Sequence, residues 1–244
     1  LLKVFTLLRT LVMCFLYPFY LSVTSLTFIG CNYLFSSRSL DNRIIKYWGG
    51  ITCWMFGVSV QVQGLENVPS GGCLFVFNHT SFFDIFSMSA AFPGFRFGAK
   101  KELFQIPFFG PAMSRAGVLV IDRADRREVY KVYDNNREKI LRGEKFALAP
   151  EGTRQNAEIL APFKTGPFIF AIGAKAPIVP VIIKNANAVM PKKSWLPNWD
   201  AWHRTIHIQV LPAISTEAET FETRHDLQKK VYNVMKDYFT VCQV

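Results

Sequence analysis

The chain has 244 residues, with 28 Lys and Arg against 18 Asp and Glu, a formal net charge of +10 and a pI of about 9.5. This length fits one large α/β domain, alone or with a small appendage, and the positive charge favours an anionic partner. Half of the residues are hydrophobic and 15% are aromatic, which is unlike a typical nucleic-acid-binding domain. We therefore expect a membrane surface as the partner, and no nucleic acid.

The five cysteines, at positions 14, 31, 53, 73 and 242, are scattered along the chain. They form no Cys-x-x-Cys pair and no Cys/His pair at zinc spacing, so we expect reduced thiols in a protein that faces the cytosol. The sequence begins with Leu-Leu and lacks an initiator Met. We expect that the natural N-terminus lies upstream or has been trimmed.

The N-terminal stretch is strongly apolar. Val4 to Phe35 carries one charge, Arg9, and we expect Pro18 to break the helix. From Thr10 to Phe35 about 26 uncharged residues follow one another, which exceeds the roughly 20 that a membrane span requires. This apolar stretch is too long for a signal peptide, and no clear small-x-small cleavage site precedes a mature start.

A polar link, Ser36 to Lys46, separates this stretch from a second apolar segment, Tyr47 to Val58. The second segment is too short to cross a bilayer comfortably. Two arrangements remain open, one transmembrane helix or a helical hairpin that dips into one leaflet, and we favour the hairpin. Residues 1–57 are then the membrane anchor. Three of its aromatic side chains are expected at the headgroup level: Tyr47, Trp48 and Trp54.

From residue 58 the pattern becomes that of an α/β domain. Short apolar runs predict strands at Val58–Gln63, Cys73–Phe77, Phe95–Ala99, Val118–Ile121, Phe146–Ala149, Ile178–Ile183 and Ile206–Leu211. Helical patterns are clearest at Phe82–Ala91, Arg126–Arg142, Thr165–Lys175 and Glu219–Phe239. We expect a mixed sheet of about seven strands flanked by helices, in one domain over residues 58–244.

One predicted strand, Cys73–Phe77, stops at a polar cluster with an imidazole and a carboxylate. His79 follows the carboxyl end of this strand, where ligands bind in open α/β sheets. Asp84 comes five residues later, in the first helical turn, and can accept an imidazole N–H if the turn folds back. We interpret His79 and Asp84 as candidate catalytic residues. The alternative is a helix-capping box, Ser81-x-x-Asp84, with an incidental histidine.

A second predicted strand also runs into a polar turn, Pro150 to Arg154. Gly152 lets backbone N–H groups approach a ligand closely, Thr153 adds a hydroxyl, and Arg154 carries a planar fork suited to phosphate. Glu151 can brace Arg154 or a backbone amide. Taken alone, this sequence favours an ordinary turn with an exposed arginine.

Several other stretches allow two interpretations each. Gly98 to Gly110 contains two lysines and an aromatic patch, which suit either a phosphate site beside an acyl groove or a solvated turn above a core. Gly117 to Arg123 is a strand that ends in an Asp-Arg pair, which we interpret as structural, and Phe163 to Gly166 offers another cation. Three tryptophans suggest a membrane-facing or loop cluster: Trp195, Trp199 and Trp202. The histidines other than His79 are assigned to surface or structural roles.

Together these stretches resemble the 1-acylglycerol-3-phosphate acyltransferase family, also called lysophosphatidic acid acyltransferases. The resemblance extends over about half of the chain, from Gly64 to Ile183, and depends on the order and spacing of its motifs. The four main blocks are Asn78–Asp84 (His-x4-Asp), Gly117–Arg123, Pro150–Arg154 and Ile178–Val181, and two further segments are Lys100–Gly110 and Phe163–Gly166. Two residues depart from the family pattern, Ala149 and Gln155, and they leave the identity of the acceptor open.

The resemblance implies transfer of a fatty acyl group from acyl-CoA or acyl carrier protein to the sn-2 hydroxyl of lysophosphatidic acid. His79 is then the general base and Asp84 orients it. The residues implied in acceptor binding are Lys100, Glu151, Gly152, Thr153 and Arg154. We expect no cofactor and no metal, and an active site at the phospholipid bilayer that faces the cytoplasm.

Three alternatives to this activity stay open. The first is an acyltransferase of the same family that acts on another lysophospholipid, a lyso-aminolipid or glycerol 3-phosphate. The second is a hydrolase that uses Ser81 or Cys73 as its nucleophile. The third is a lipid-binding protein without catalytic activity.

Overall fold

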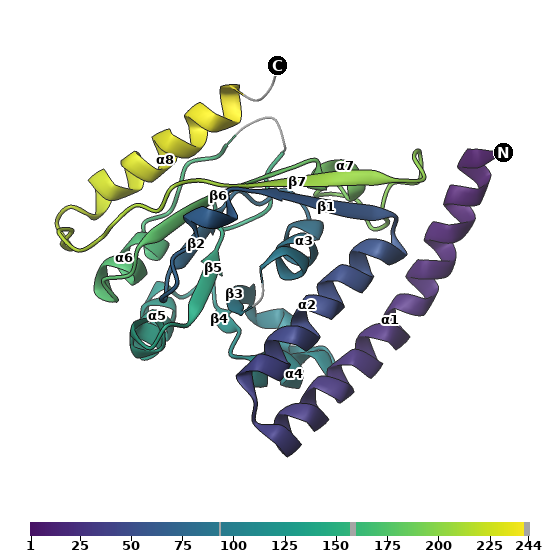
Figure 1. The fold of residues 1–244 in the computed structure, drawn as a ribbon, viewed down its shortest axis with the longest axis horizontal. Coiled ribbons are helices and arrows are strands. Elements are labelled where there is room, and N and C mark those ends of the chain that lie inside the picture. Colours follow the sequence, from purple (N-terminus) through teal and green to yellow (C-terminus); the bar gives the residue numbers. More distant parts are fainter. Residues whose placement is uncertain (93, 157–159, 242–244) are drawn as a thin grey trace.

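The computed structural model of this chain describes residues 1–92, 94–156 and 160–241. A seven-stranded sheet lies between two layers of helices, and α1 runs along one side of the molecule (Figure 1). In chain order the elements are α1 (Leu2–Phe35), α2 (Arg38–Met55), β1 (Val58–Gln63), η1 (Leu65–Asn67), β2 (Leu74–Phe77), α3 (Phe83–Ala91), β3 (Phe95–Lys100), η2 (Lys101–Gln105), α4 (Phe109–Ala116), β4 (Leu119–Ile121), α5 (Arg126–Leu141), β5 (Lys145–Leu148), α6 (Gly166–Gly173), β6 (Ile178–Lys184), α7 (Ala186–Val189), β7 (Arg204–Val210) and α8 (Arg224–Val241).

The strand order determines where a site can form. It reads β1-β7-β6-β2-β5-β3-β4, with β6 and β7 antiparallel and all other neighbours parallel. The predicted mixed α/β fold is therefore confirmed. Because β2, β5, β3 and β4 are neighbours that run the same way, their carboxyl ends meet at one edge of the sheet, where ligands bind in such folds.

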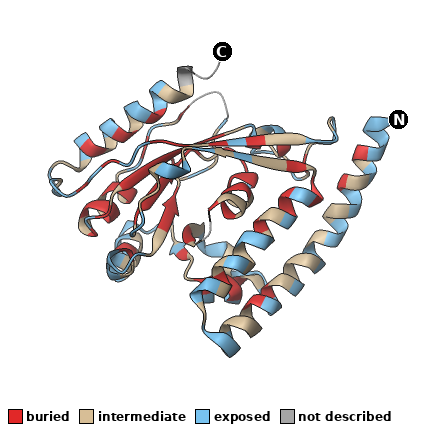
Figure 2. Ribbon diagram, in the orientation of Figure 1, coloured by how far each residue is buried: buried red, intermediate tan, exposed pale blue. Residues whose placement is uncertain are grey.

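The core lies on both faces of the sheet, as the alternation along β2 illustrates (Figure 2). Leu74 and Val76 join a cluster under α5, α6 and α8, whereas Phe75 and Phe77 join a second cluster under α2, α3 and α7. Successive side chains of a strand point to opposite faces, so a strand covered on both sides is apolar throughout. Each of the four residues of β2 is at most 2% exposed.

The two N-terminal helices differ from the prediction in two respects. α1 continues through Pro18, where we expected a break. A proline removes one helical hydrogen bond, and the rest of this 34-residue helix tolerates that loss. The polar link predicted at Ser36–Lys46 is also wrong, because only residues 36 and 37 are non-helical and α2 begins at Arg38.

The polar residues at the start of α2 have partners that are distant in the sequence, which explains the second error. Asp41 is 2% exposed and accepts a hydrogen bond from Asn32 Nδ2 at 3.0 Å. Asn42 Oδ1 accepts one from Arg96 Nη1 on β3, also at 3.0 Å. Asp41 is buried and Asn42 is half-buried, and a local pattern cannot distinguish such polar contacts of a packed helix from a solvated link.

The aromatic residues of α2 do not all face outward. Tyr47 and Trp54 are 66% and 74% exposed, as expected for side chains at a headgroup level. Trp48 instead faces inward, where its indole ring lies 5.2 Å from the ring of Phe86 and 5.9 Å from that of Phe109, between centroids. The predicted headgroup position is therefore wrong for Trp48.

The predicted boundary between an anchor (1–57) and an α/β domain (58–244) falls where α2 gives way to β1. Cys53 and Met55 of α2 nevertheless belong to the core cluster under the sheet. The division into two domains stays a prediction.

At Gly49 the backbones of α2 and α3 approach each other closely. A Cβ atom at this position would lie 2.6 Å from both the Phe86 carbonyl oxygen and the Ser89 Cβ, whereas one at Gly50 would meet nothing within 4 Å. We expect Gly49→Ala to lower the free energy of unfolding by about 1–3 kcal/mol through overpacking. Gly50→Ala is the matched control and is expected to raise it by roughly 0.5–1 kcal/mol through helix propensity. Chemical denaturation of the two variants checks this, and equal effects would contradict it.

Candidate active site

Asn78 anchors the turn that follows β2. Its Nδ2 donates to the Ile183 carbonyl oxygen at 2.9 Å, and its Oδ1 accepts from the Ile183 N–H at 2.7 Å. The side chain thus bonds to β6 as a further strand residue would, although the chain has already turned. This pairing fixes the direction in which the next residue, His79, leaves the sheet.

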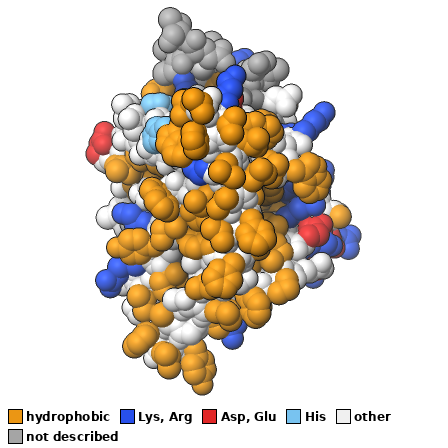
Figure 3. Space-filling view, turned by 90° about the vertical axis from the view of Figure 1, so that its right-hand side faces the viewer, with side chains coloured by type: hydrophobic (Ala, Val, Ile, Leu, Met, Phe, Trp, Pro, Cys, Tyr) orange, Lys and Arg blue, Asp and Glu red, His pale blue; other side chains and the backbone are white. Residues whose placement is uncertain are grey.

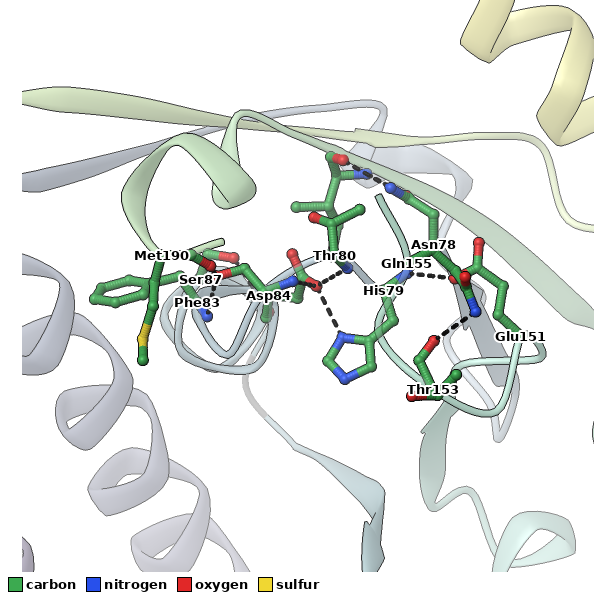
Figure 4. Close-up of polar contacts among 12 residues, drawn as sticks. Asn78, His79, Thr80, Phe83, Asp84, Ser87, Glu151, Thr153, Gln155 and Met190 are labelled. Carbon is green, nitrogen blue, oxygen red and sulfur yellow. Dashed lines mark hydrogen bonds and ion pairs between the residues drawn. The ribbon is translucent and has the colours of Figure 1, made fainter. Parts of the chain in front are cut away.

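His79 and Asp84 are in contact. The His79 Nδ1 atom lies 2.8 Å from Asp84 Oδ2, which also accepts the N–H groups of Thr80 at 2.7 Å and Ser81 at 2.8 Å (Figure 4). Asp84 is fully buried, while the His79 side chain is 15% exposed. The carboxylate therefore fixes the imidazole ring and leaves its Nε2 atom available to a ligand.

The capping-box interpretation describes part of the same turn. Asp84 accepts the Ser81 N–H, as the acidic residue of such a box does. The Ser81 hydroxyl, however, accepts the N–H of Phe83 and donates to the Met190 carbonyl oxygen. Asp84 thus both stabilises the turn and orients His79, so the two interpretations are compatible.

The second polar turn holds the backbone of His79 from the other side. Glu151 Oε2 accepts the His79 N–H at 3.3 Å, and the Gln155 N–H donates to the His79 carbonyl oxygen at 2.7 Å (Figure 4). Glu151 is 4% exposed and does not line the adjacent cavity. Of the two contacts expected for Glu151, the structure shows the one to a backbone amide, and its role in acceptor binding stays a prediction.

Burial raises the pKa of Glu151 from 4.5 to about 8. Between these values the native protein keeps a proton that the unfolded chain releases, so this group stabilises the fold fully below pH 4.5 and less as the pH rises toward 8. Glu151→Gln stays neutral and should lack this dependence. We expect the stability of the wild type relative to Glu151→Gln to fall between about pH 5 and 8, as measured by urea unfolding. Parallel pH profiles would contradict this.

A cavity of about 730 Å³ opens beside His79. Much of its polar lining comes from the carboxyl ends of four neighbouring strands: Lys100 at the end of β3, Arg123 after β4, Thr153 and Arg154 after β5, and His79 after β2. Most of the remaining lining is apolar and comes from the helices, including Tyr17 and Leu21 of α1 and Phe109 and Met113 of α4. The cavity therefore combines a cationic region with a long apolar wall, which suits an amphipathic anion.

Arg154 has an unused hydrogen-bond donor at this cavity. Its guanidinium carbon lies 3.9 Å from the centroid of the Phe82 ring, and its Nη1 atom is buried with no hydrogen-bond partner within the described part of the chain. Burial, with a smaller contribution from the nearby Arg123, lowers the pKa of Arg154, while the charge of Asp84 opposes this. A buried donor without a partner favours a ligand that supplies one.

Lys100, Gly152 and Thr153 occupy different positions around the site. Lys100 lines the cavity but is exposed, with its Nζ atom 3.4 Å from Glu102. Gly152 has a φ of +75°, and a Cβ there would lie 2.8 Å from Lys164 Nζ, so this glycine gives the turn its shape and leaves space for Lys164. Thr153 reaches the cavity directly.

Arg123 was not among the predicted site residues. We interpreted its Asp-Arg pair as structural, but Asp122 pairs with Lys101 at 2.6 Å and Arg123 lines the cavity. The available signal was positional, because Arg123 follows β4 as Arg154 follows β5, and both strands end at the same edge.

The two proposed hydrolytic nucleophiles are poorly placed. The Ser81 hydroxyl is fully buried and engaged by Phe83 and Met190. Cys73 is also fully buried, and burial raises the pKa of its thiol to about 12, so a thiolate is strongly disfavoured. Neither residue lines the cavity. Cys14, Cys31, Cys53 and Cys73 are free thiols, and Cys242 lies outside the described residues.

A histidine–aspartate pair at the edge of a mixed sheet, next to a cationic and apolar cavity, defines an α/β protein with a candidate acid–base site. Residues 59–184 match the Acyltransferase family. The match covers half of the chain, which therefore belongs to this family, and the predicted resemblance is confirmed.

Named relatives agree with this assignment. A chloroplastic 1-acyl-sn-glycerol-3-phosphate acyltransferase of Brassica napus is 35% identical over 159 residues, which cover 64% of this chain and 46% of that protein. The enzyme of the same name from Saccharomyces cerevisiae is 32% identical over 188 residues, covering 75% of this chain and 60% of that protein. The chain thus spans about half the length of these curated relatives.

A solved structure has the same fold over the whole chain. The crystal structure of the 1-acyl-sn-glycerophosphate (LPA) acyltransferase PlsC from Thermotoga maritima superposes with a TM-score of 0.83 and 23% sequence identity. The superposition covers 100% of this chain and 98% of that one. The matched region therefore includes the N-terminal helices as well as the α/β domain.

Proposed function

We propose that this protein is a membrane-associated acyltransferase that moves a fatty acyl group from an acyl thioester to the sn-2 hydroxyl of 1-acylglycerol 3-phosphate, giving phosphatidic acid. The main support is the 2.8 Å contact between His79 Nδ1 and Asp84 Oδ2, which leaves His79 Nε2 at a cavity with cationic and apolar walls. Relatives that carry the name of this enzyme support the choice of acceptor.

The reaction proceeds by direct transfer. His79 Nε2 takes the proton of the sn-2 hydroxyl as its oxygen attacks the thioester carbonyl carbon. The carbon–sulfur bond breaks as the tetrahedral intermediate collapses, and the imidazolium returns its proton to the leaving thiolate. Asp84 stabilises the imidazolium and holds the ring. No acyl-enzyme forms, in agreement with the poor placement of Ser81 and Cys73. Neither a cofactor nor a metal takes part in these steps.

The cationic residues recognise the acceptor phosphate. Arg154 supplies a buried donor without a partner, and Lys100 and Arg123 add positive charge from the two adjacent strands. The oxyanion of the intermediate needs other donors than the turn amides of His79, Thr80 and Ser81, because the side chains of Glu151 and Asp84 already accept these N–H groups. The apolar wall then holds the acyl chains.

The helical hairpin lies in one leaflet. The outer face of α1 exposes a row of apolar side chains, including Phe5, Leu8, Leu11, Val12, Phe15, Phe19, Val23 and Leu26. Four of its residues are buried, Thr6, Thr10, Ser25 and Phe28, and the half-buried Tyr17 and Tyr20 pack against the core cluster under α2, α3 and α7, so the helix contacts the α/β body at several points along its length. A perpendicular span would draw that body, with its loops and sheet edges, into the hydrocarbon, which is unfavourable. The orientation of the active site toward the cytoplasm is part of this proposal.

The activity is tested by release of free thiol from acyl-CoA and from acyl carrier protein, with lysophosphatidic acid present or absent. We expect release only with the acceptor, and phosphatidic acid as the product by mass spectrometry. Thiol release without acceptor would indicate a hydrolase, and a trapped acyl-enzyme would rule out direct transfer. Faster transfer to glycerol 3-phosphate, another lysophospholipid or a lyso-aminolipid would support acyl transfer but would show that lysophosphatidic acid is not the preferred acceptor. Binding of lysolipid without any thiol release would indicate a non-catalytic lipid-binding protein.

A further inference from the structure

The segment between α7 and β7 exposes three tryptophans. We refer to residues 190–203 as the tryptophan loop. In this loop Trp195 is 95% exposed, Trp199 41% and Trp202 47%. Indole rings gather where one end of the side chain is in an apolar phase and the other is in water, as at a membrane interface. Three exposed indole rings in one loop form an apolar surface of the kind that marks an interaction site.

Hydrogen bonds order the loop. Arg204 Nη1 donates to the carbonyl oxygens of Asn198 at 3.2 Å and Ala201 at 3.1 Å. The Asn198 N–H donates to the Val189 carbonyl oxygen at 2.7 Å, and its Nδ2 donates to that of Ala188 at 2.9 Å. The exposed tryptophans therefore project from a structured segment.

Arg9 attaches the loop to the membrane-facing helix. Its Nη1 donates to the Trp202 carbonyl oxygen at 2.6 Å, its Nη2 donates to that of Phe56 at 3.3 Å, and its guanidinium carbon lies 4.3 Å from the Trp202 ring. Gly57 allows this approach, because a Cβ there would overlap the Trp202 carbonyl oxygen. The one charge in the apolar stretch of α1 thus ties α1, the end of α2 and the tryptophan loop together.

The loop and α1 also line the same cavity. Trp195, Leu196 and Pro197 contribute from the loop, and Tyr17 and Pro18 contribute from α1. The face of the molecule on this side carries extensive apolar side chains with Lys and Arg at its margins (Figure 3). Within the loop, Lys192 and Lys193 are exposed, which suits the anionic surface of a bilayer.

We propose that the tryptophan loop is a second bilayer contact, which inserts Trp195 at the interface of the leaflet that holds α1. This rests on the proposed function for the position of α1. The loop and the helix then flank the cavity on its membrane side, so a lysolipid passes between them without leaving the bilayer. The partner is a phospholipid surface with anionic headgroups.

Quenching by brominated lipids tests this contact in the full chain. Vesicles of phosphatidylcholine and phosphatidylglycerol are prepared with and without bromine on the acyl chains, and wild-type protein is compared with Trp195→Phe on each. The difference in tryptophan emission is that of Trp195 itself. We expect this difference to be clearly smaller on brominated vesicles, because bromine quenches indoles that it reaches. An equal difference on both vesicles would overturn the proposal.

Phe221→Trp is the matched control. Phe221 is 55% exposed and precedes α8, which lies across the molecule from α1 (Figure 1). The difference in tryptophan emission between Phe221→Trp and the wild type should be the same on brominated and unbrominated vesicles. Equal quenching at positions 195 and 221 would mean non-specific adsorption and would overturn the proposal. The measurement does not depend on catalytic turnover. Trp195 can therefore be quenched in a protein that transfers no acyl group, and it can remain unquenched in an active enzyme.

Discussion

Replacing His79 with alanine is expected to lower kcat by about 10²- to 10⁴-fold, the contribution that a general base makes to proton transfer. The expectation follows from the position of the ring, with Nδ1 held by Asp84 at 2.8 Å and the side chain 15% exposed at the cavity. The measurement is acceptor-dependent thiol release under saturating substrate. Unchanged turnover would remove His79 from the mechanism.

Two further measurements separate this loss from a loss of structure. The His79 backbone holds the second turn through its N–H and carbonyl groups, and alanine keeps both, so the unfolding midpoint of His79→Ala should stay near that of the wild type. Lysophosphatidic acid should also bind the variant with unchanged affinity. A variant that unfolds early or binds no acceptor would mean that His79 has a structural role.

Asp84 should behave differently from His79 because its carboxylate has two tasks. Asp84→Asn can still accept the Thr80 and Ser81 N–H groups, so it should fold yet turn over more slowly. Asp84→Ala leaves those two buried donors unsatisfied, at a cost of about 1–3 kcal/mol for each group. Urea unfolding and thiol release on the same two variants check this distinction. Equal stability of the two would contradict the structural task of Asp84.

Much of the fold was predictable because apolar periodicity is a local signal. The bounds predicted for β1 are those observed, and the other strands agree to within two residues at each end. The error at the polar link arises from tertiary contacts, since Asp41 is buried and bonded to Asn32 and Asn42 accepts a hydrogen bond from Arg96. α4 was missed for a similar reason, since its glycine and proline weaken the helical pattern and its stability comes from packing against α1.

The candidate site was predictable where reactive or charged side chains directly follow a predicted strand. His79, Asp84 and Arg154 follow or flank predicted strands, and the parallel order β2-β5-β3-β4 brings them to one edge. Arg123 was missed because its neighbour Asp122 pairs with Lys101, a residue of another segment, and not with Arg123. The contact of Glu151 with the His79 backbone could only be offered as one of two options, because which amide lies opposite a carboxylate depends on the register of β2 against β5.

Arg154→Ala is expected to raise KM for lysophosphatidic acid by about 10- to 100-fold, the value of one or two charge-assisted hydrogen bonds to phosphate. Its Nη1 atom is buried without a partner in the described chain, so truncation should cost the fold little. Arg154→Lys keeps the charge but loses the planar fork and the stacking on Phe82, so its KM should lie between that of the wild type and that of Arg154→Ala. Steady-state kinetics with acceptor varied at saturating acyl-CoA measures all three proteins.

A neutral acceptor distinguishes phosphate recognition from a general loss of activity. With 1-monoacylglycerol, which lacks the phosphate, wild type and Arg154→Ala should have similar kcat/KM, because the arginine then has no anion to bind. Lys100→Ala serves as the matched comparison, because Lys100 lines the same cavity but is exposed and already lies near Glu102. A solvent-screened ion pair contributes little binding energy. Lys100→Ala should therefore raise KM for lysophosphatidic acid less than Arg154→Ala does. If Arg154→Ala impairs transfer to both acceptors equally, Arg154 shapes the cavity through its packing on Phe82. The phosphate must then be bound by other residues, and Arg123, which lines the same cavity, is the next candidate.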